Sequence, residues 1–189
     1  MRIAYLDCFS GVSGDMALAA LVHAGADLDD VAAVLGKLPL QGVTLQPEPT
    51  DVHGTAALRL HIDAPEQPVI RTYSNIRLLL DESDLSPAAR RTAQRIYHLL
   101  ANATASVHGK EPELVTFAEF GEADSLIEVV GVAVALELLA VERVFSSPVP
   151  TGLGMVRTEH GIQPIPSPVV VELLHGVPTY SRGIPAELV

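Results

Sequence analysis

The chain has 189 residues and a formal net charge of −11 at pH 7, with 48% hydrophobic and 19% charged residues. A field of that sign repels phosphate backbones, so we expect no nucleic acid partner, and the apolar runs are too short to predict a membrane span. A single cysteine, Cys8, excludes an internal disulfide framework and predicts a reducing, cytoplasmic location. The mean hydropathy of +0.31 favours a covered sheet or a protein interface, for example in a homo-oligomer.

The opening residues predict a strand, a polar loop and a helix in succession. A short apolar run, Ile3–Leu6, is followed by the loop Asp7–Asp15 and then by the alanine-rich segment Met16–His23. The loop contains carboxylates, a thiol, hydroxyls and glycines, and Ser13 stands where it can cap the helix. Backbone N–H groups at a helix start attract anions, so this loop is a candidate ligand cradle. The alternative is a capped strand-to-helix turn that binds nothing.

Turn residues and apolar periodicity predict the remaining elements. In chain order they are a helix over 28–37 capped by Asp27, strands over 43–46 and 56–62 paired as a hairpin with a longer loop, a helix over 73–82 capped by Ser74, a helix over 87–108 capped by Ser86, a strand over 114–120, an apolar helix ending near 142, a strand over 144–149, a loop or short hairpin over 151–166, a helix over 169–175 capped by Ser167, and an extended tail. This order predicts an α/β or α+β fold, in which a mixed sheet carries helices packed on it, within a single domain over 1–189.

A second polar cluster stands at the start of the long apolar helix. Glu119 lies at an expected strand end, and Asp124 and Glu128 are four residues apart, so they share a helix face. Three converging carboxylates could hold a hard cation. The alternative is that the acidic residues complement the positive end of the helix and stay solvated.

A glycine-rich stretch near the end of the chain is the third candidate. Gly152 and Gly154 precede Arg157 and His160, and this group could bind an anion, although a glycine hairpin is the simpler explanation. No two histidines are four apart on one predicted helix, so histidine spacing does not indicate a metal site. Cys8 is more often a small buried hydrophobe than a nucleophile or a thiolate ligand.

Motifs along nearly the whole chain resemble those of the nickel-pincer cofactor biosynthesis protein LarC family. The segments that carry the resemblance are Leu6–Met16, Tyr73–Leu85, Val107–Gly109, Glu119–Gly131, Ser147–Pro150, His160–Pro166, Glu172–Pro178 and Glu187–Val189.

The resemblance implies a nickel chelatase, or cyclometallase, of the lyase class. Such an enzyme places nickel between the two thiocarboxylate sulfurs and the ring carbon of a pyridinium mononucleotide, and it consumes CTP. In the family, a separate C-terminal domain holds the CTP and its metal. We therefore expect residues 1–189 to be the N-terminal domain only, which works with a CTP-binding partner subunit or is a stand-alone homologue.

The resemblance and the residue chemistry together give a candidate site. Its members are Asp7, Cys8, Glu119 and Asp124 for catalysis, Ser10, Gly11, Ser13, Gly14, Asp15, Ser125 and Arg157 for substrate binding, and Cys8, His108 and His160 for nickel.

Several positions depart from the family pattern. Ile70, Thr116 and Ala118 stand where the resemblance implies histidines, and Glu128 replaces an aspartate. Threonine and alanine cannot replace imidazole as nickel ligands. Two alternatives therefore stay open: a binding module that holds a pyridinium mononucleotide without inserting metal, and a diverged enzyme that uses the same pocket without nickel.

Overall fold

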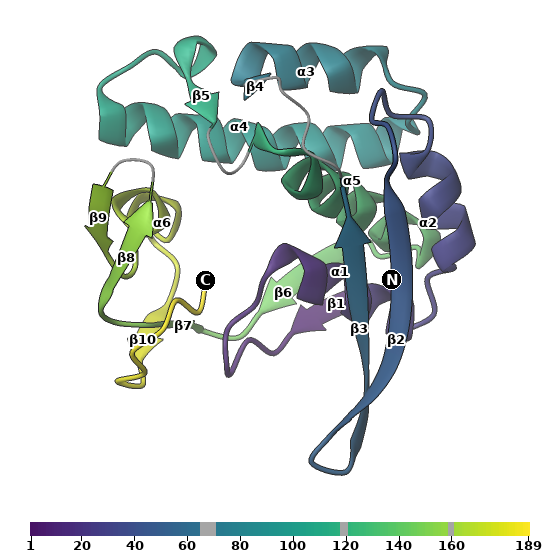
Figure 1. The fold of residues 1–189 in the computed structure, drawn as a ribbon, viewed down its shortest axis with the longest axis horizontal. Coiled ribbons are helices and arrows are strands. Elements are labelled where there is room, and N and C mark those ends of the chain that lie inside the picture. The colour runs from purple at the N-terminus through teal and green to yellow at the C-terminus, as the bar shows by residue number, and fades with distance from the viewer. Residues whose placement is uncertain (65–70, 118–120, 159–160) are drawn as a thin grey trace. The chain divides into compact units, whose positions relative to one another are not determined.

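A computed structural model describes residues 1–64, 71–117, 121–158 and 161–189 of the chain (Figure 1). Its elements divide between two compact units, which we call unit 1 and unit 2. Unit 1 comprises Met1–Ser13, His98–Val115 and Val141–Val189, and unit 2 comprises Gly14–Tyr97 and Thr116–Ala140.

Unit 2 combines helices with a long hairpin. Its elements are α1 (Gly14–His23), α2 (Leu28–Leu35), β2 (Thr44–Val52), β3 (Thr55–Asp63), β4 (Arg71–Thr72), α3 (Tyr73–Glu82), the first part of α4 (Pro87–His108), β5 (Thr116–Phe117) and α5 (Ala123–Leu138). Helix α5 ends four residues before the position expected from its apolar pattern. Of the strand expected over 114–120, the described residues contain β5, preceded by a 3₁₀ turn over Pro112–Leu114, and residues 118–120 lie outside the described residues.

The hairpin of unit 2 is longer and tighter than the sequence predicts. Strands β2 and β3 pair antiparallel over nine residues each, and Figure 1 shows them reaching out past the helices of the unit. Their turn is His53 and Gly54, with φ of 53° and 83°. Both values lie in the left-handed region that tight hairpins require, so the expected longer loop is wrong.

The core of unit 2 gathers around α5. Leu126, Ile127 and Val130 of this helix are completely buried, and α5 packs against α1 and α2. A Cβ at Gly131 would lie 2.8 Å from Leu18 Cδ2, so the missing side chain lets α1 approach closely. Apolar area removed from water in this way is the main stabilising term of the unit.

Side-chain caps fix where the helices of unit 2 begin. Asp27 accepts hydrogen bonds from two backbone N–H groups of α2, and Ser86 accepts one from Ala89 at the start of α4, both as expected. Helix α3 is capped by Thr72, which accepts a bond from Asn75 N–H, so Ser74 is the wrong cap. Thr72 ends β4, and its hydroxyl is therefore placed one residue ahead of the helix.

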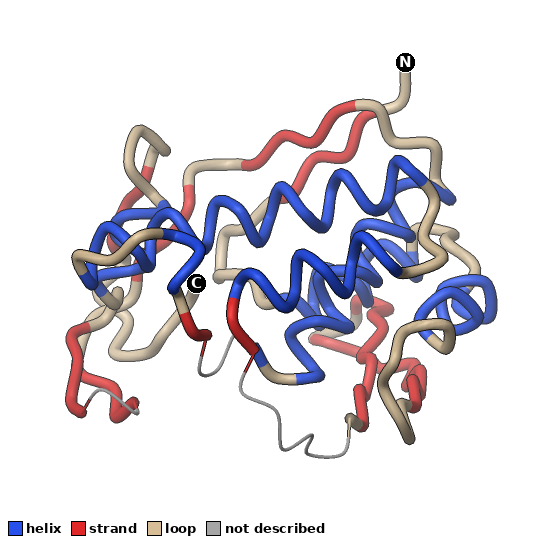
Figure 2. Tube along the Cα trace, turned by 90° about the horizontal axis from the view of Figure 1, so that it is seen from above, coloured by secondary structure: helices blue, strands red, loops and turns tan. Residues whose placement is uncertain are grey.

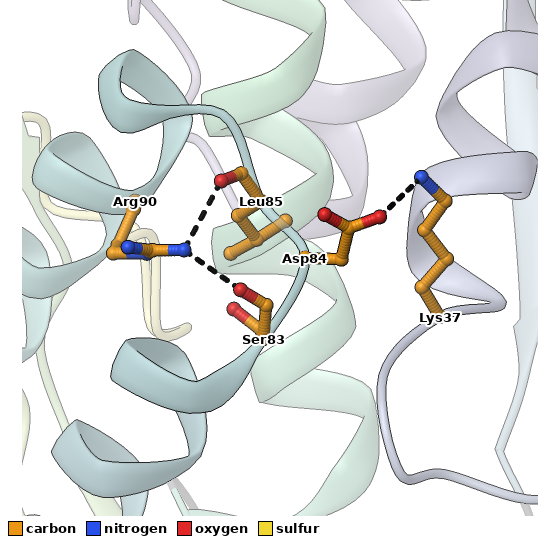
Figure 3. A network of polar contacts seen from close by, with 5 residues as sticks. All are labelled: Lys37, Ser83, Asp84, Leu85 and Arg90. Atoms are coloured by element: carbon orange, nitrogen blue, oxygen red, sulfur yellow. Dashed lines mark hydrogen bonds and ion pairs between the residues drawn. The ribbon is translucent and has the colours of Figure 1, made fainter.

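Polar contacts fasten the connection between α3 and α4 (Figure 3). Arg90 Nη2 donates to the carbonyl oxygens of Ser83 and Leu85, at 2.7 and 3.2 Å. Lys37 Nζ forms an ion pair with Asp84 at 2.9 Å, and its hydrogen bond holds the pKa of that carboxyl below the ordinary value. The exposed ion pair adds little stability, whereas the arginine satisfies two loop carbonyls that the helices leave unpaired.

Unit 1 combines short strands with the last part of α4 and one further short helix. Its further elements are β1 (Ile3–Leu6), β6 (Arg143–Ser146), β7 (Val149–Thr151), β8 (Met155–Thr158), β9 (Gly161–Pro164), α6 (Pro168–Leu173) and β10 (Thr179–Ser181). Strands β1 and β6 pair in parallel, as do β7 and β10, and β8 and β9 form a hairpin. The strand expected over 144–149 is divided at Ser147 and Pro148 into β6 and β7.

The mixed α/β class is confirmed. The described strands form five two-stranded sheets, and the trace in Figure 2 shows the strand segments in red and the helices in blue. None of the helices in the described ranges is both long and apolar enough to cross a lipid bilayer.

Candidate functional site

A tight turn at the end of β1 carries Cys8 in unit 1. The backbone N–H of Cys8 donates to Ser147 Oγ at 2.9 Å, and the N–H of Gly11 donates back to the Cys8 carbonyl oxygen at 3.0 Å. Ser147 N–H in turn donates to the Leu6 carbonyl oxygen at 2.9 Å, which extends the β1–β6 pairing by one bond. The turn therefore stands at the C-terminal end of a parallel strand pair, where α/β folds commonly place ligand sites.

The thiol of this turn is sheltered. Cys8 is only 4% exposed, whereas Asp7 and Ser10 on either side of it are exposed. Burial, and then the carboxylate of Asp7, raise the pKa of the Cys8 thiol above its ordinary value of 9.0. Cys8 is therefore a neutral thiol at neutral pH and must lose a proton before it can bind a metal ion or act as a nucleophile.

A second polar cluster lies in unit 2, where α5 meets the start of α1. A Cβ at Gly14 would lie 2.2 Å from Glu128 Oε2, so glycine is what lets the carboxyl reach the helix end. The backbone N–H of Asp15 donates to Glu128, and the side chain of Glu128 is half-buried. Burial raises the pKa of Glu128 to about 7, with Asp15 and Asp124 adding to the rise.

Glu128 is consequently the carboxyl best suited to proton transfer in the described part of unit 2. A group with a pKa of about 7 is present in both protonation states at neutral pH. Its contact with Asp15 N–H also uses one of the amides that the opening loop was expected to offer to a phosphate. A phosphate at this loop would have to bind other amides.

The predicted site residues are distributed over both units. Unit 1 contains Asp7, Cys8, Ser10, Gly11, Ser13, His108 and Arg157, and unit 2 contains Gly14, Asp15, Asp124 and Ser125. The structure brings Gly14, Asp15 and Asp124 together around Glu128, and Ser125 N–H donates to Asp124 Oδ1 at 2.7 Å.

Four other predicted residues are at the surface or are not described. His108 is exposed as the last residue of α4, and Arg157 is exposed on β8. Glu119 and His160 lie outside the described residues. Across the described ranges, no three His, Cys, Asp or Glu side chains are grouped as a metal ion would need.

Two members of these clusters were not among the predicted site residues. The sequence places Glu128 on the same helix face as Asp124. Its contact with Gly14 joins segments that are far apart in the sequence, and no pattern in the neighbouring residues predicts that contact. Ser147 accepts a hydrogen bond from the backbone N–H of Cys8. It lies in the Ser147–Pro150 motif, which is the sequence feature that could have indicated its role.

Comparison with known proteins places this architecture in a family. The family model described as nickel insertion protein matches residues 4–189. A relative from Geobacter sp. (strain M21), named for nickel insertion, is 42% identical over 186 residues, which cover 97% of the chain and 48% of the relative. A relative of similar name from Roseiflexus castenholzii (strain DSM 13941 / HLO8) is 44% identical over 190 residues, covering 99% of the chain and 48% of the relative.

One relative has a more specific name. The pyridinium-3,5-bisthiocarboxylic acid mononucleotide nickel insertion protein of Desulfitobacterium hafniense (strain DSM 10664 / DCB-2) is 38% identical over 188 residues, covering 100% of the chain and 47% of the relative. The chain thus spans about half the length of these curated relatives. No solved structure matches the chain. The match over nearly all residues confirms the resemblance in the sequence: the chain belongs to the nickel insertion protein family.

Proposed function

We propose that the chain takes part in nickel-pincer cofactor biosynthesis, by inserting nickel into a pyridinium bisthiocarboxylic acid mononucleotide. The observation that carries this proposal is the family match over residues 4–189, together with the relative named for that substrate. The chain acts as one half of a cyclometallase of the lyase class, because the relatives are about twice as long. The other half supplies the site for CTP.

The chemistry requires a route for nickel and a route for a proton. The substrate offers two thiocarboxylate sulfurs, and a bond from nickel to the ring carbon between them releases the hydrogen of that carbon as a proton. Nickel favours thiolate and imidazole ligands over water, so a protein ligand must hold it until the substrate sulfurs take over.

Cys8 is the soft ligand proposed to hand nickel over. The thiol loses its proton on binding nickel, and the two substrate sulfurs complete the ligand set. This division of ligands agrees with the lack of a three-residue metal group in the described residues. His108 and His160 remain the imidazoles proposed to assist.

Carboxylates are proposed to receive the ring proton and to attract the cationic ring. Asp7 stands beside Cys8 in sequence and is exposed, and Glu119 was expected to share this role. Within unit 2, Glu128 has the properties of a proton acceptor, because a carboxylate with a pKa of about 7 is a stronger base than an ordinary glutamate and is still partly ionised at neutral pH.

A binding module that holds the mononucleotide without inserting nickel is the second candidate. Thr116 favours it, because this threonine of β5 stands where the resemblance implies an imidazole. A thermal-shift assay with the metal-free mononucleotide tests this reading. A rise in the unfolding midpoint that nickel and Cys8→Ala leave unchanged would support the binding module over nickel insertion.

The proposal is tested by retention of nickel on the purified chain with and without the pyridinium bisthiocarboxylic acid mononucleotide. We expect nickel to be retained by the chain and substrate together, and Cys8→Ala to weaken that retention at least about tenfold. Because one proton leaves the thiol, the affinity should rise by about tenfold per pH unit below the thiol pKa. Retention that is independent of both Cys8 and pH would exclude Cys8 as the nickel ligand.

A further inference from the structure

The C-terminal segment 180–188, which we call the strap, is hydrogen-bonded to the turn that carries Cys8. Both belong to unit 1. Arg182 Nη1 donates to the Phe9 carbonyl oxygen at 2.8 Å, and the Tyr180 hydroxyl donates to the same oxygen at 3.4 Å. On the other side of the turn, Val12 N–H donates to the Leu188 carbonyl oxygen at 3.0 Å. The strap thus holds the turn from both ends.

Two glycines leave the space that the strap occupies. A Cβ at Gly11 would lie 2.2 Å from the Leu188 carbonyl oxygen, and a Cβ at Gly152 would lie 1.6 Å from the Ala186 carbonyl oxygen. Neither distance can be tolerated, and both clashes are with backbone. Any other residue at either position would therefore displace the strap, so the sequence is matched to this packing at two separate points.

Few other bonds fix the turn. Cys8 N–H is held by Ser147 Oγ, and Gly11 N–H closes the turn onto the Cys8 carbonyl oxygen. Within the described residues, the hydrogen bonds that join Phe9 and Val12 to residues outside the opening segment come from the strap. Release of the strap would leave the turn held at Cys8 alone, and a turn held by so few bonds opens locally at low free-energy cost.

We propose that the strap controls access to the Cys8 thiol. With the strap in place the turn is closed and the thiol is sheltered, and when the strap leaves, Phe9 to Val12 are released and the thiol becomes accessible to a metal ion or an electrophile. Arg182 is a positioning residue in this arrangement, since it acts on Cys8 through the Phe9 carbonyl. The biological purpose of this control, admission of nickel to Cys8, rests on the proposed function; the control itself does not.

The test is the rate at which iodoacetamide alkylates the full chain. Cys8 is the only cysteine, so the rate reports on this thiol alone. Gly152→Ala should displace the strap at Ala186 without changing the turn, because Gly152 has no positive φ. We expect alkylation to be about tenfold or more faster in Gly152→Ala and about fivefold faster in Arg182→Ala, which loses one of two bonds to Phe9.

Matched controls separate release of the strap from general destabilisation. Arg91→Ala removes the same side chain from the exposed face of α4, and Gly36→Ala places a Cβ 3.3 Å from the nearest atom in unit 2. Both should leave the alkylation rate within about twofold. Rates should also be nearly independent of low urea concentrations, because local opening exposes little surface.

The proposal is overturned if both strap variants alkylate at the wild-type rate. It is also overturned if their faster rates increase with urea in parallel with global unfolding, followed by circular dichroism. Faster alkylation in the strap variants, with nickel retention independent of Cys8, would confirm the strap and contradict the proposed role of Cys8 in nickel insertion.

Discussion

In unit 2, Leu18, Ile76 and Leu126 are completely buried, whereas in unit 1 Met155 and Ile162 expose 63% and 65% of their surface. The contrast extends further: among the described residues between Val141 and Val189, those classed as buried are Pro150 and Gly152. Unit 2 is held by a packed apolar core. In unit 1 the buried apolar residues lie mainly on the last part of α4, and the segment Val141–Val189 is held by short strand pairs and loop hydrogen bonds.

This difference in packing affects how firmly each unit holds its candidate functional residues. The carboxyl of Glu128 keeps its raised pKa because it is held against α1 by the packed helices of unit 2. The Cys8 turn is instead fixed by a few hydrogen bonds, which can open and close without the cost of disrupting a core. We therefore expect the surroundings of Glu128 in unit 2 to be rigid, and the turn that carries Cys8 in unit 1 to open locally.

Truncation of a core residue should give the largest difference between the units. Ile76→Ala removes a completely buried side chain of α3, and we expect the free energy of unfolding to fall by about 2–5 kcal/mol. Ile162→Ala, on the exposed face of β9, should change it by about 0.5 kcal/mol or less. Urea unfolding of both variants measures this, and equal losses would contradict the contrast.

The charge on Glu128 should give the next largest effect. The folded state binds a proton at this carboxyl with a pKa of about 7, and the unfolded chain with the ordinary value of 4.5. The folded state is therefore favoured below pH 4.5, and this stabilisation is lost as the pH rises to about 7. Glutamine carries no charge at any pH, so Glu128→Gln should not lose this stabilisation as the pH rises.

Above pH 7 we expect Glu128→Gln to be more stable than the wild type by about 1–2 kcal/mol, after allowance for the exposed half of the side chain. Below pH 4.5 the two proteins should be equally stable. Unfolding free energies of both proteins across this pH range measure the effect, with the exposed Glu111→Gln as a control that should show no such trend. If the difference in unfolding free energy between the wild type and Glu128→Gln does not change with pH, the pKa of Glu128 is not raised in the folded state.

Helix caps should give the smallest difference between the units. Ser86 accepts a bond from Ala89 N–H at 3.1 Å and donates to Glu137, whereas Ser167 accepts one from Val170 N–H at 3.5 Å at the start of the short helix α6. Ser86→Ala should cost about 1–2 kcal/mol, and Ser167→Ala about 0.5 kcal/mol or less. Thermal unfolding followed by circular dichroism compares the two, and a larger loss for Ser167→Ala would contradict the contrast.

Local features of the fold could be predicted from the sequence, and contacts between distant segments could not. Asp27, Ser86 and Ser167 were correctly predicted as caps because a cap depends on a few neighbouring residues. Thr72 was missed because its role depends on where β4 ends, and β4 exists only through its pairing with β5.

The same limit applies to the candidate site. The polar loop from Asp7 to Asp15 was found because its residue types are unusual together, and the family was found from long motifs. The position of Glu128 beside Gly14 and the bonds of Arg182 to the turn join distant parts of the chain. No periodicity or spacing in the sequence predicts such contacts.

The central claim is that the chain inserts nickel through Cys8, and the most direct measurement is product formation. The chain is incubated with nickel, CTP, the pyridinium bisthiocarboxylic acid mononucleotide and the half of the Desulfitobacterium hafniense relative that the chain does not match. We predict that mass spectrometry detects a product that has gained one nickel and lost the ring proton, at a rate that Cys8→Ala lowers about 100-fold or more. Equal rates with and without the Cys8 thiol, or no product from the wild-type chain beside an active full-length relative, would contradict the claim.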